Sequence, residues 1–239
     1  MLSSTKTIAI VPARAGSKGL ARKNFLSFAG KPLYAHAIAQ GMRLADSCIL
    51  SSDDDTALTI ADPKPSHRHL RPAGLAADDT PMDMVLADVI THFKLWDETI
   101  VLLQPTSPLR PDQLIIDAIN LHKNGSYDLV LGASIVDSSV LKCGFSHGDQ
   151  FAPVNAPSFC FANRQSLPPL YKPNGSVFVF TASWFVNNRG LACDNIGMVK
   201  LHPTLNIDID NRDDFNRAEA AFQQQRHKIT HIESHATNG

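Results

Sequence analysis

The sequence predicts an α/β fold in which helices cover both faces of a mostly parallel sheet. Short apolar segments of strand-like composition alternate with helix-like segments through the first half of the chain, an order typical of parallel sheets. The chain has 239 residues, a length that suits one compact domain with a small appendage. We therefore expect a Rossmann-like three-layer sandwich, formed by a single domain over residues 1–226.

The first half of the chain supplies four predicted strands and three predicted helices. The strands are Thr7–Val11, Ser47–Ser51, Thr99–Leu103 and Asp128–Ala133. The first helix begins at Pro32, where the missing N–H of proline has no cost, and the second spans Met82–Phe93. The third begins near Pro111-Asp112 and ends at Asn124-Gly125; its apolar face is Leu114, Ile115, Ala118 and Ile119.

The alternation fails between residues 136 and 173, where prolines interrupt the chain while phenylalanines keep it apolar. The prolines are Pro153, Pro157, Pro168 and Pro169, and the phenylalanines are Phe145, Phe151, Phe159 and Phe161. This composition predicts an inserted arm rather than a layer of the sheet. The aromatic residues are too many for a solvated loop, so we expect them to pack against another subunit.

Regular elements return after the arm. The predicted strands are Ser176–Phe180, Met198–Leu201 and Asn206–Ile209. A helix follows from Asp213 to about Gln225, because Phe215, Ala218, Ala221 and Phe222 repeat at helical spacing. Residues 227–239 are polar, and we expect them to form a flexible tail.

Composition excludes several classes of function. The net charge of −1 gives no overall basic field for nucleic acid, and no apolar run approaches the roughly 20 residues that span a bilayer. The polar segment Met1–Lys6 leads directly into a strand, which argues against a signal peptide. The scattered cysteines form no C-x-x-C pair, so we expect reduced thiols in a cytoplasmic protein: Cys48, Cys143, Cys160 and Cys193. His67 and His69 could chelate a metal, but beside two prolines a loop with two solvated histidines is the stronger expectation.

The strongest functional feature is the loop that follows the first predicted strand. It carries two glycines and four cations: Gly16, Gly19, Arg14, Lys18, Arg22 and Lys23. Small residues let backbone N–H groups approach an anion, and the cations add charge, so the loop suits a polyphosphate. Neither the G-x-x-x-x-G-K-[ST] nor the G-x-G-x-x-G pattern occurs. A basic surface turn is the alternative for this loop taken alone.

Three further segments carry polar side chains in positions suited to a site. Gln104–Arg110 follows a predicted strand and is stiffened by two prolines, and Lys172–Gly175 ends in an Asn-Gly turn. In a strand Asp208 and Asp210 would share one face, about 6.5 Å apart, which suits a hard divalent cation. Taken singly, the first segment could be a stiff turn, the second a tight turn and the third a solvated strand edge. Asp213 and Asp214 are expected to cap the last helix.

Together these segments resemble the CMP-sialic acid synthetases and their relatives, the acylneuraminate cytidylyltransferases. The resemblance runs from Ile8 to about Ala220, with the family's motifs in order and spacing. They are Pro12–Leu20 with Lys23-Asn24, Leu70-Arg71-Pro72, Gln104–Arg110, Pro173-Asn174-Gly175 and Ile207–Asp210. The resemblance implies a nucleotide-diphospho-sugar transferase type of fold. It also implies the activation of a nine-carbon keto-sugar acid by CTP, with pyrophosphate as the second product.

The resemblance implies a role for each matching residue. The nucleotide would be bound by Ala13, Arg14, Gly16, Ser17, Lys23, Asn24 and Arg71. Arg14, Lys23 and Asp210 would be catalytic, and Asp208 and Asp210 would bind Mg²⁺. The sugar acid would be contacted by Gln104, Lys142 and Arg164. The arm crosses to a second subunit in relatives, which implies a homodimer with shared sites. The general base remains open.

Three alternatives stay open at this stage. The segment Asp78–Asp83 replaces the serine-rich stretch typical of sialate enzymes, so legionaminate or pseudaminate is as good a substrate as sialic acid. A Kdo cytidylyltransferase would use the same chemistry on an eight-carbon sugar, but it usually carries Gln-Gly-Asp-Glu-Pro where this chain has Gln104–Pro108. A nucleotide-binding scaffold without catalysis would be expected to lose a metal carboxylate or the loop lysine, and Lys23, Asp208 and Asp210 are all present.

Overall fold

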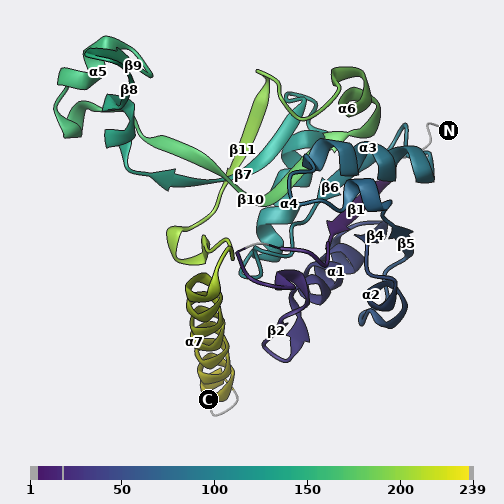
Figure 1. Ribbon diagram of the computed structural model, residues 1–239. Helices are drawn as coiled ribbons and strands as arrows, with labels where there is room; N and C mark the ends of the chain where they lie inside the picture. Colours follow the sequence, from purple (N-terminus) through teal and green to yellow (C-terminus); the bar gives the residue numbers. More distant parts are fainter. Residues whose placement is uncertain (1–4, 18, 237–239) are drawn as a thin grey trace.

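A central sheet with helices on both faces forms the body of the protein (Figure 1). The computed structural model describes residues 5–17 and 19–236. Within them one sheet has the strand order β11-β7-β10-β6-β1-β4-β5. Its strands are β1 (Thr7–Pro12), β4 (Ser47–Ser52), β5 (His67–Leu70), β6 (Thr99–Leu102), β7 (Leu129–Val136), β10 (Leu170–Thr181) and β11 (Ile196–Lys200). All neighbours pair in parallel except β10, which is antiparallel to both β6 and β7.

The outer layers of the sandwich are formed by α1 (Leu33–Leu44), α2 (Asp55–Ile60), α3 (Met82–Phe93), α4 (Asp112–Lys123) and α6 (Ala182–Asn188). Helix α5 (Pro157–Phe161) lies outside these layers, and α7 (Arg212–Ala236) extends away from the sheet (Figure 1). Short 3-10 turns lie at Lys23–Phe25, Ala73–Leu75, Ser138–Lys142, Arg164–Ser166 and Pro203–Leu205. A small hairpin, β2 (Ser27–Phe28) and β3 (Lys31–Pro32), precedes α1.

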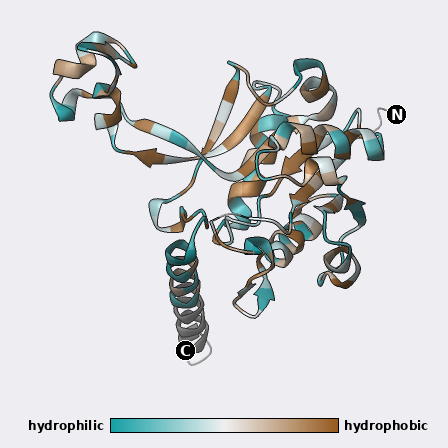
Figure 2. Ribbon diagram, viewed as in Figure 1, coloured by the Kyte–Doolittle hydropathy of each residue, from teal (hydrophilic) through white to brown (hydrophobic). Residues whose placement is uncertain are grey.

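Both faces of the sheet are buried, as expected for parallel strands. In β1, Ala9 and Val11 pack in the cluster that also contains residues of α1, α2 and α4. Ile8 and Ile10 point the other way, into the cluster formed with α3 and α6. Figure 2 shows the central strands as largely hydrophobic. The predicted three-layer α/β sandwich with a mostly parallel sheet is confirmed.

The predicted arm projects from the body, but its boundaries differ from the sequence expectation (Figure 1). Strand β10 begins at Leu170 rather than Ser176, and its first residues pair with the end of β7, from Leu170↔Val136 to Pro173↔Ala133. The base of the arm is therefore an extension of the sheet. The tip holds the hairpin of β8 (Gly144–His147) and β9 (Gln150–Pro153), together with α5.

The C-terminal part corrects two expectations. Residues 206–210, all of them described, form no strand; the Ile209 N–H donates instead to the carbonyl of Thr106, in the loop after β6 (2.9 Å). The in–out alternation nevertheless survives, since Ile209 is fully buried against Phe28 and Phe215 while Asp208 and Asp210 face outward. Helix α7 continues to Ala236, past the expected end near residue 225. Residues 237–239 of the expected tail lie outside the described part of the chain.

The two histidines expected in a solvated loop belong to an edge strand. His67 is exposed on β5, but His69 is only 1% exposed. The expectation was wrong for His69, because the short strand pairs in parallel with β4 and turns that ring toward α3. Within the described residues, none of the helices combines the length and the apolar character needed to cross a membrane.

Candidate functional site

The residues predicted to bind a nucleotide meet where several parallel strands end. A cavity of about 160 Å³ opens at the carboxyl ends of β1, β5 and β6, the edge at which α/β proteins bind ligands. It is lined by Pro12, Arg14, Ser17, Lys23, Asn24, Arg71, Met82, Gln104, Pro105 and Thr106. Most residues of the expected nucleotide site, together with Gln104, are thus brought to one cavity.

The loop after β1 is held by hydrogen bonds from its neighbours. The Ala13 N–H donates to the Ser51 carbonyl (2.8 Å), and the Ser52 hydroxyl donates to the Ala13 carbonyl (2.7 Å). The Asn24 side-chain amide donates to the Arg14 carbonyl (3.0 Å), which gives Asn24 a role in shaping the loop. Ser17 Oγ accepts from the Lys23 N–H (3.2 Å). Lys18, one of the expected cations, lies outside the described residues.

Gly19 is required where the loop after β1 meets the segment that precedes α7. A Cβ at this position would lie 2.5 Å from the Asp210 carbonyl oxygen, closer than a side chain tolerates. Gly16 has open space around it, so packing does not explain its choice. The phosphate-loop candidate and the acidic segment near Asp210 are therefore in direct contact, although about 190 residues separate them in sequence.

Two of the predicted catalytic cations pair with carboxylates. Arg14 forms an ion pair with Asp78, from the segment between β5 and α3. Lys23 Nζ donates to Asp210 Oδ1 (2.8 Å). Sequence reasoning noted Asp78 only as a departure from the family's pattern. Its partner could not be inferred, because the pair joins loops 64 residues apart.

Asp208 and Asp210 are two residues apart, and both face outward. Partial desolvation of the Asp208 carboxyl by neighbouring protein atoms raises its pKa, an effect that Asp210 increases and that the Thr106 hydroxyl and Lys23 oppose. Asp214 Oδ2 accepts from the N–H groups of Asp210 and Asn211 (3.1 and 3.2 Å), and Asn211 Oδ1 accepts from the Asp214 N–H (2.9 Å). This reciprocal cap at the start of α7 bears out the capping role expected of Asp214 and fixes the acidic segment.

Arg110 is a structural residue that sequence reasoning did not single out. Its guanidinium is 3% exposed and donates to the carbonyls of Gln104 (3.3 Å) and Ser176 and to Gln40 Oε1 (2.8 Å). Burial lowers its pKa to about 9. Arg110 thus links the loop that carries Gln104 to strand β10 at Ser176. Its position at the end of the Gln104–Arg110 motif was the available clue.

A second cavity, of about 280 Å³, adjoins Asp208 on the side of the arm. Its lining residues are Ser134, Val136, Lys172, Pro173, Asn174, Gly175, Asn206 and Asp208. Gly175 has φ +72°, and a Cβ there would lie 2.8 Å from Gln104 Oε1 and 4.0 Å from Asp208 Oδ2. Gln104 and Asp208 therefore approach each other across Gly175, between the two cavities.

Lys142 and Arg164 are not brought to either cavity. Lys142 Nζ donates to the Ala162 carbonyl (2.5 Å), and Arg164 Nη2 pairs with Asp137 Oδ2 (3.2 Å), both within the arm. Arg164 is exposed. Within one chain, the arm carries these two cations away from the cluster formed by the other predicted residues (Figure 1).

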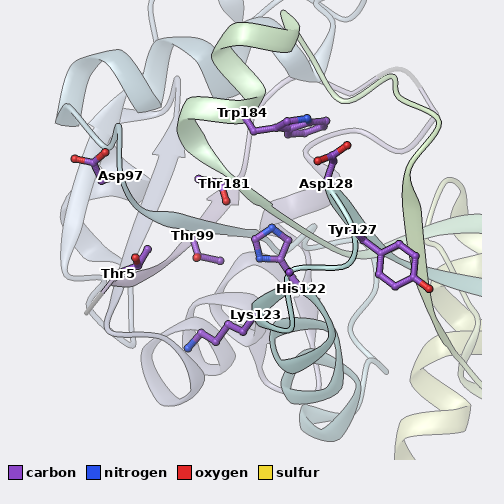
Figure 3. Close-up of a pocket in the computed structure, with 10 residues that line it drawn as sticks. Thr5, Asp97, Thr99, His122, Lys123, Tyr127, Asp128, Thr181 and Trp184 are labelled. Atoms are coloured by element: carbon purple, nitrogen blue, oxygen red, sulfur yellow. The ribbon is translucent and has the colours of Figure 1, made fainter. Parts of the chain in front are cut away.

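A larger hollow, of about 570 Å³, lies at the opposite end of the sheet (Figure 3). It is lined by Thr99 at the start of β6, Thr181 at the end of β10, and His122 and Trp184, among others. No predicted site residue borders it. We assign the candidate site to the smaller cavity, because Arg14, Lys23 and Arg71 line it and Lys23 joins it to Asp210.

The comparisons with known proteins point to one family. The family described as Cytidylyltransferase matches residues 8–154. The chain is 30% identical to a CMP-N,N'-diacetyllegionaminic acid synthase of Legionella pneumophila, covering 91% of this chain and 97% of that protein. It is 27% identical to an N-acylneuraminate cytidylyltransferase of Streptococcus agalactiae over 97% of its own length, but it spans only 58% of that relative.

Solved structures share the fold. A CMP:2-keto-3-deoxy-manno-octonic acid synthetase complexed with CTP superimposes with a TM-score of 0.67 over 92% of this chain and 100% of that chain. A 4-diphosphocytidyl-2C-methyl-D-erythritol synthase gives 0.65 over 92% and 99%. Both are 14% identical to this chain, so they show the architecture alone.

Proposed function

The chain belongs to the cytidylyltransferase family, and on that premise we propose that it transfers CMP from CTP to a nine-carbon keto-sugar acid. The anomeric hydroxyl oxygen would attack the α-phosphorus of CTP in line. The bond from that phosphorus to the bridging oxygen breaks, pyrophosphate leaves, and the hydroxyl proton passes to a base. The observation that carries the proposal is the cavity that joins Arg14, Lys23 and Arg71 beside the Asp208–Asp210 segment.

Within this proposal the loop after β1 binds the triphosphate. Arg14 and Lys23 would exchange their carboxylate partners for phosphate oxygens and meet the charge that grows on them in the transition state. Ala13, Gly16, Ser17 and Asn24 would supply backbone and side-chain contacts at the same loop. Arg71 would complete the nucleotide pocket from the end of β5.

The acidic segment fits a magnesium ion. Asp208 and Asp210 offer hard oxygen ligands, and desolvation together with the charge of Asp210 raises the pKa of Asp208, which a bound cation would offset. Two carboxylates would leave the rest of the coordination shell to phosphate oxygens and water, as Mg²⁺ commonly has it. When bound there, Mg²⁺ would offset phosphate charge and lower the pKa of the attacking hydroxyl.

The sugar acid would occupy the cavity beside Gly175, in reach of Gln104 and Asp208. Because Lys142 and Arg164 lie in the projecting arm, they would act on the partner's site in a homodimer. Exposed apolar side chains on the arm support this assembly: Phe145, Phe151, Val154 and Phe161. Residues 1–226 would then be one nucleotidyltransferase domain with a dimerisation arm.

The relatives of 27 to 30% identity favour sialic or legionaminic acid over Kdo, because the Kdo synthetase shares only the fold at 14% identity. The test is to incubate the protein with CTP, Mg²⁺ and, separately, N-acetylneuraminate, legionaminate, pseudaminate and Kdo, and to detect CMP-sugar by mass and pyrophosphate by a coupled assay. Product from one of the nine-carbon acids supports the proposal. Product from Kdo alone corrects the substrate, and CTP binding without product from any acid identifies a scaffold.

A further inference from the structure

A chain of four polar side chains runs from helix α3 to the nucleotide cavity. Asp88 Oδ2 lies 3.0 Å from His69 Nε2, and His69 Nδ1 lies 3.0 Å from Ser51 Oγ. Arg71 donates through Nε to Ser51 Oγ (3.4 Å) and through Nη2 to the Ser51 carbonyl (3.2 Å). The chain thus links α3, β5 and β4, and it ends on a residue that lines the candidate site.

The direction of the hydrogen bonds at Ser51 follows from Arg71. A guanidinium can only donate, so Ser51 Oγ accepts from Arg71. The Ser51 hydroxyl proton is then free to bond His69 Nδ1, which accepts it when the neutral ring carries its own proton on Nε2. Asp88 Oδ2 lies 3.0 Å from Nε2 as a charged neighbour, without a hydrogen bond of ordinary geometry. Ser51, His69 and Arg71 are 0%, 1% and 5% exposed, so little water is available to replace any of these partners.

We propose that His69 is a positioning residue of the nucleotide site, which accepts the Ser51 hydroxyl proton and so orients that hydroxyl to hold the Arg71 guanidinium at the cavity. The proposal rests on the proposed function, because it takes Arg71 as a ligand of CTP. Ser51 also accepts the Ala13 N–H through its carbonyl (2.8 Å). The same strand residue therefore anchors the first residue of the triphosphate loop and the arginine that faces it.

The surroundings of His69 keep the ring in the form that the chain requires. Burial lowers the pKa of His69 most; His92 on α3 and Arg71 lower it further, while Asp88 raises it. His92 packs edge-on against His69 with ring centroids 5.1 Å apart. Were Nδ1 protonated, it would donate to Ser51 Oγ, and the serine proton would lose its acceptor. Protonation of His69 would therefore loosen the contact that orients Arg71.

Calorimetric titration with CTP tests the proposal with three variants. Ser51→Ala removes the hydroxyl that accepts from Arg71 Nε but keeps the backbone carbonyl that accepts from Nη2, and we expect CTP affinity to fall about tenfold. His69→Asn keeps a carbonyl that can accept from Ser51, so affinity should stay closer to that of the unaltered protein. His122→Asn is the matched control: His122 is also a buried histidine with a pKa lowered by burial, but it lies at the other end of the sheet (Figure 3).

The pH profile separates positioning from a purely structural role. Between about pH 5 and pH 8, where histidines titrate, the unaltered protein and His122→Asn should lose affinity as the pH falls more steeply than Ser51→Ala and His69→Asn do. Protonation of the CTP phosphates affects all four proteins alike, so only the difference is diagnostic. Nitrogen NMR of the unliganded protein should show His69 protonated at Nε2 and bare at Nδ1.

Each outcome is decisive. Unchanged affinity in Ser51→Ala, parallel pH profiles, or a proton on His69 Nδ1 would overturn the positioning role while leaving the proposed function intact. An unaltered protein that binds no CTP would remove both proposals. If Ser51→Ala does not fold, the comparison of His69→Asn with His122→Asn and the NMR measurement still decide the question.

Discussion

Lys23 Nζ lies 2.8 Å from Asp210 Oδ1, which joins two residues 187 positions apart in the sequence. Lys23 belongs to the loop after the first strand, and Asp210 immediately precedes the cap of the last helix. Gly19 allows the same two segments to touch through the Asp210 backbone. The candidate triphosphate site and the candidate metal site are therefore one structure, so a change in either should affect turnover.

Replacing Asp210 tests the metal assignment. Asp210→Asn removes one charge-stabilising contact and should lower kcat about 10²- to 10³-fold, while calorimetry still detects CTP binding. Asp213→Asn is the control, because this exposed acid at the start of α7 faces no predicted ligand. A near-normal rate for Asp210→Asn at saturating Mg²⁺ would refute the assignment.

Replacing Arg14 and Lys23 tests whether these loop cations stabilise the transition state or only bind CTP in the ground state. Lys23→Ala and Arg14→Ala should lower kcat, by about tenfold or more, with a smaller change in KM for CTP, since the charge that they offset grows in the transition state. Lys31→Ala, an exposed lysine 3.9 Å from Asp62, should leave both constants unchanged. If only KM rises in the first two variants, these residues bind CTP without stabilising the transition state.

Replacing Arg110 tests the structural link between Gln104 and Ser176. Arg110→Ala leaves two carbonyls and Gln40 without their donor and should lower the free energy of unfolding by about 2–4 kcal/mol, measured in urea. Arg43→Ala breaks an exposed pair with Asp112 (2.6 Å) and should cost about 0–1 kcal/mol. Equal losses in the two variants would contradict the role given to Arg110.

The buried histidines predict the acid dependence of stability. Burial lowers the pKa of both His69 and His122 below the ordinary histidine value. The unfolded chain therefore takes up protons first, and stability should fall as the pH drops below about 6.5. His122→Asn should make the dependence of Tm on pH shallower over that range. A steeper dependence in His122→Asn would mean that the ring is protonated in the folded protein.

The arm should be responsible for assembly. Phe161 is 91% exposed, and its burial against a partner would be worth about 1.5–3 kcal/mol. Phe161→Ser should therefore raise the dimer dissociation constant about tenfold or more in sedimentation equilibrium. His147→Ser, elsewhere on the arm, should have a smaller effect. A monomeric unaltered protein would exclude the dimer outright.

Mixing variants tests whether the arm acts on the partner's site. Arg164→Ala and Asp210→Asn homodimers should each be nearly inactive. If Arg164 reaches across the interface, mixed dimers regain one intact site. No recovery, with subunit exchange shown independently, would mean that Arg164 serves its own chain or its pair with Asp137.

The spacing of apolar residues in the sequence was sufficient to predict the helices and strands that bury one regular face. Met82–Phe93 was predicted to the residue, and β1, β4 and β6 to within one. It failed where tertiary contacts decide: β5 is short and flanked by prolines, so its pairing with β4 left no sequence pattern. The Asn-Gly at 174–175 suggested a turn, but it lies within β10, where the pairing register shifts between Pro173 and Phe178.

The site divides in the same way. Residues within contiguous motifs, such as Arg14 and Lys23, were placed correctly at the cavity because a strand and its loop are local. The order of strands in the sheet decides which loops become neighbours, and a single sequence does not contain that order. The pair of Arg14 with Asp78 and the contacts from His69 to Arg71 could therefore not be predicted. Lys142 and Arg164 bond within the arm, and their predicted contact with a sugar acid stays a prediction.

The antiparallel strand β10 belongs both to the base of the arm and to the central sheet. It runs from the base of the arm at Leu170, past Gly175 beside Gln104 and Asp208, to its end at Thr181. The pairing register of β10 shifts between Pro173 and Phe178, and strands bend where the hydrogen-bond ladder is interrupted. The backbone that begins at the base of the arm therefore also forms part of the cavity beside Gly175, so the position of the arm and the shape of that cavity depend on one strand.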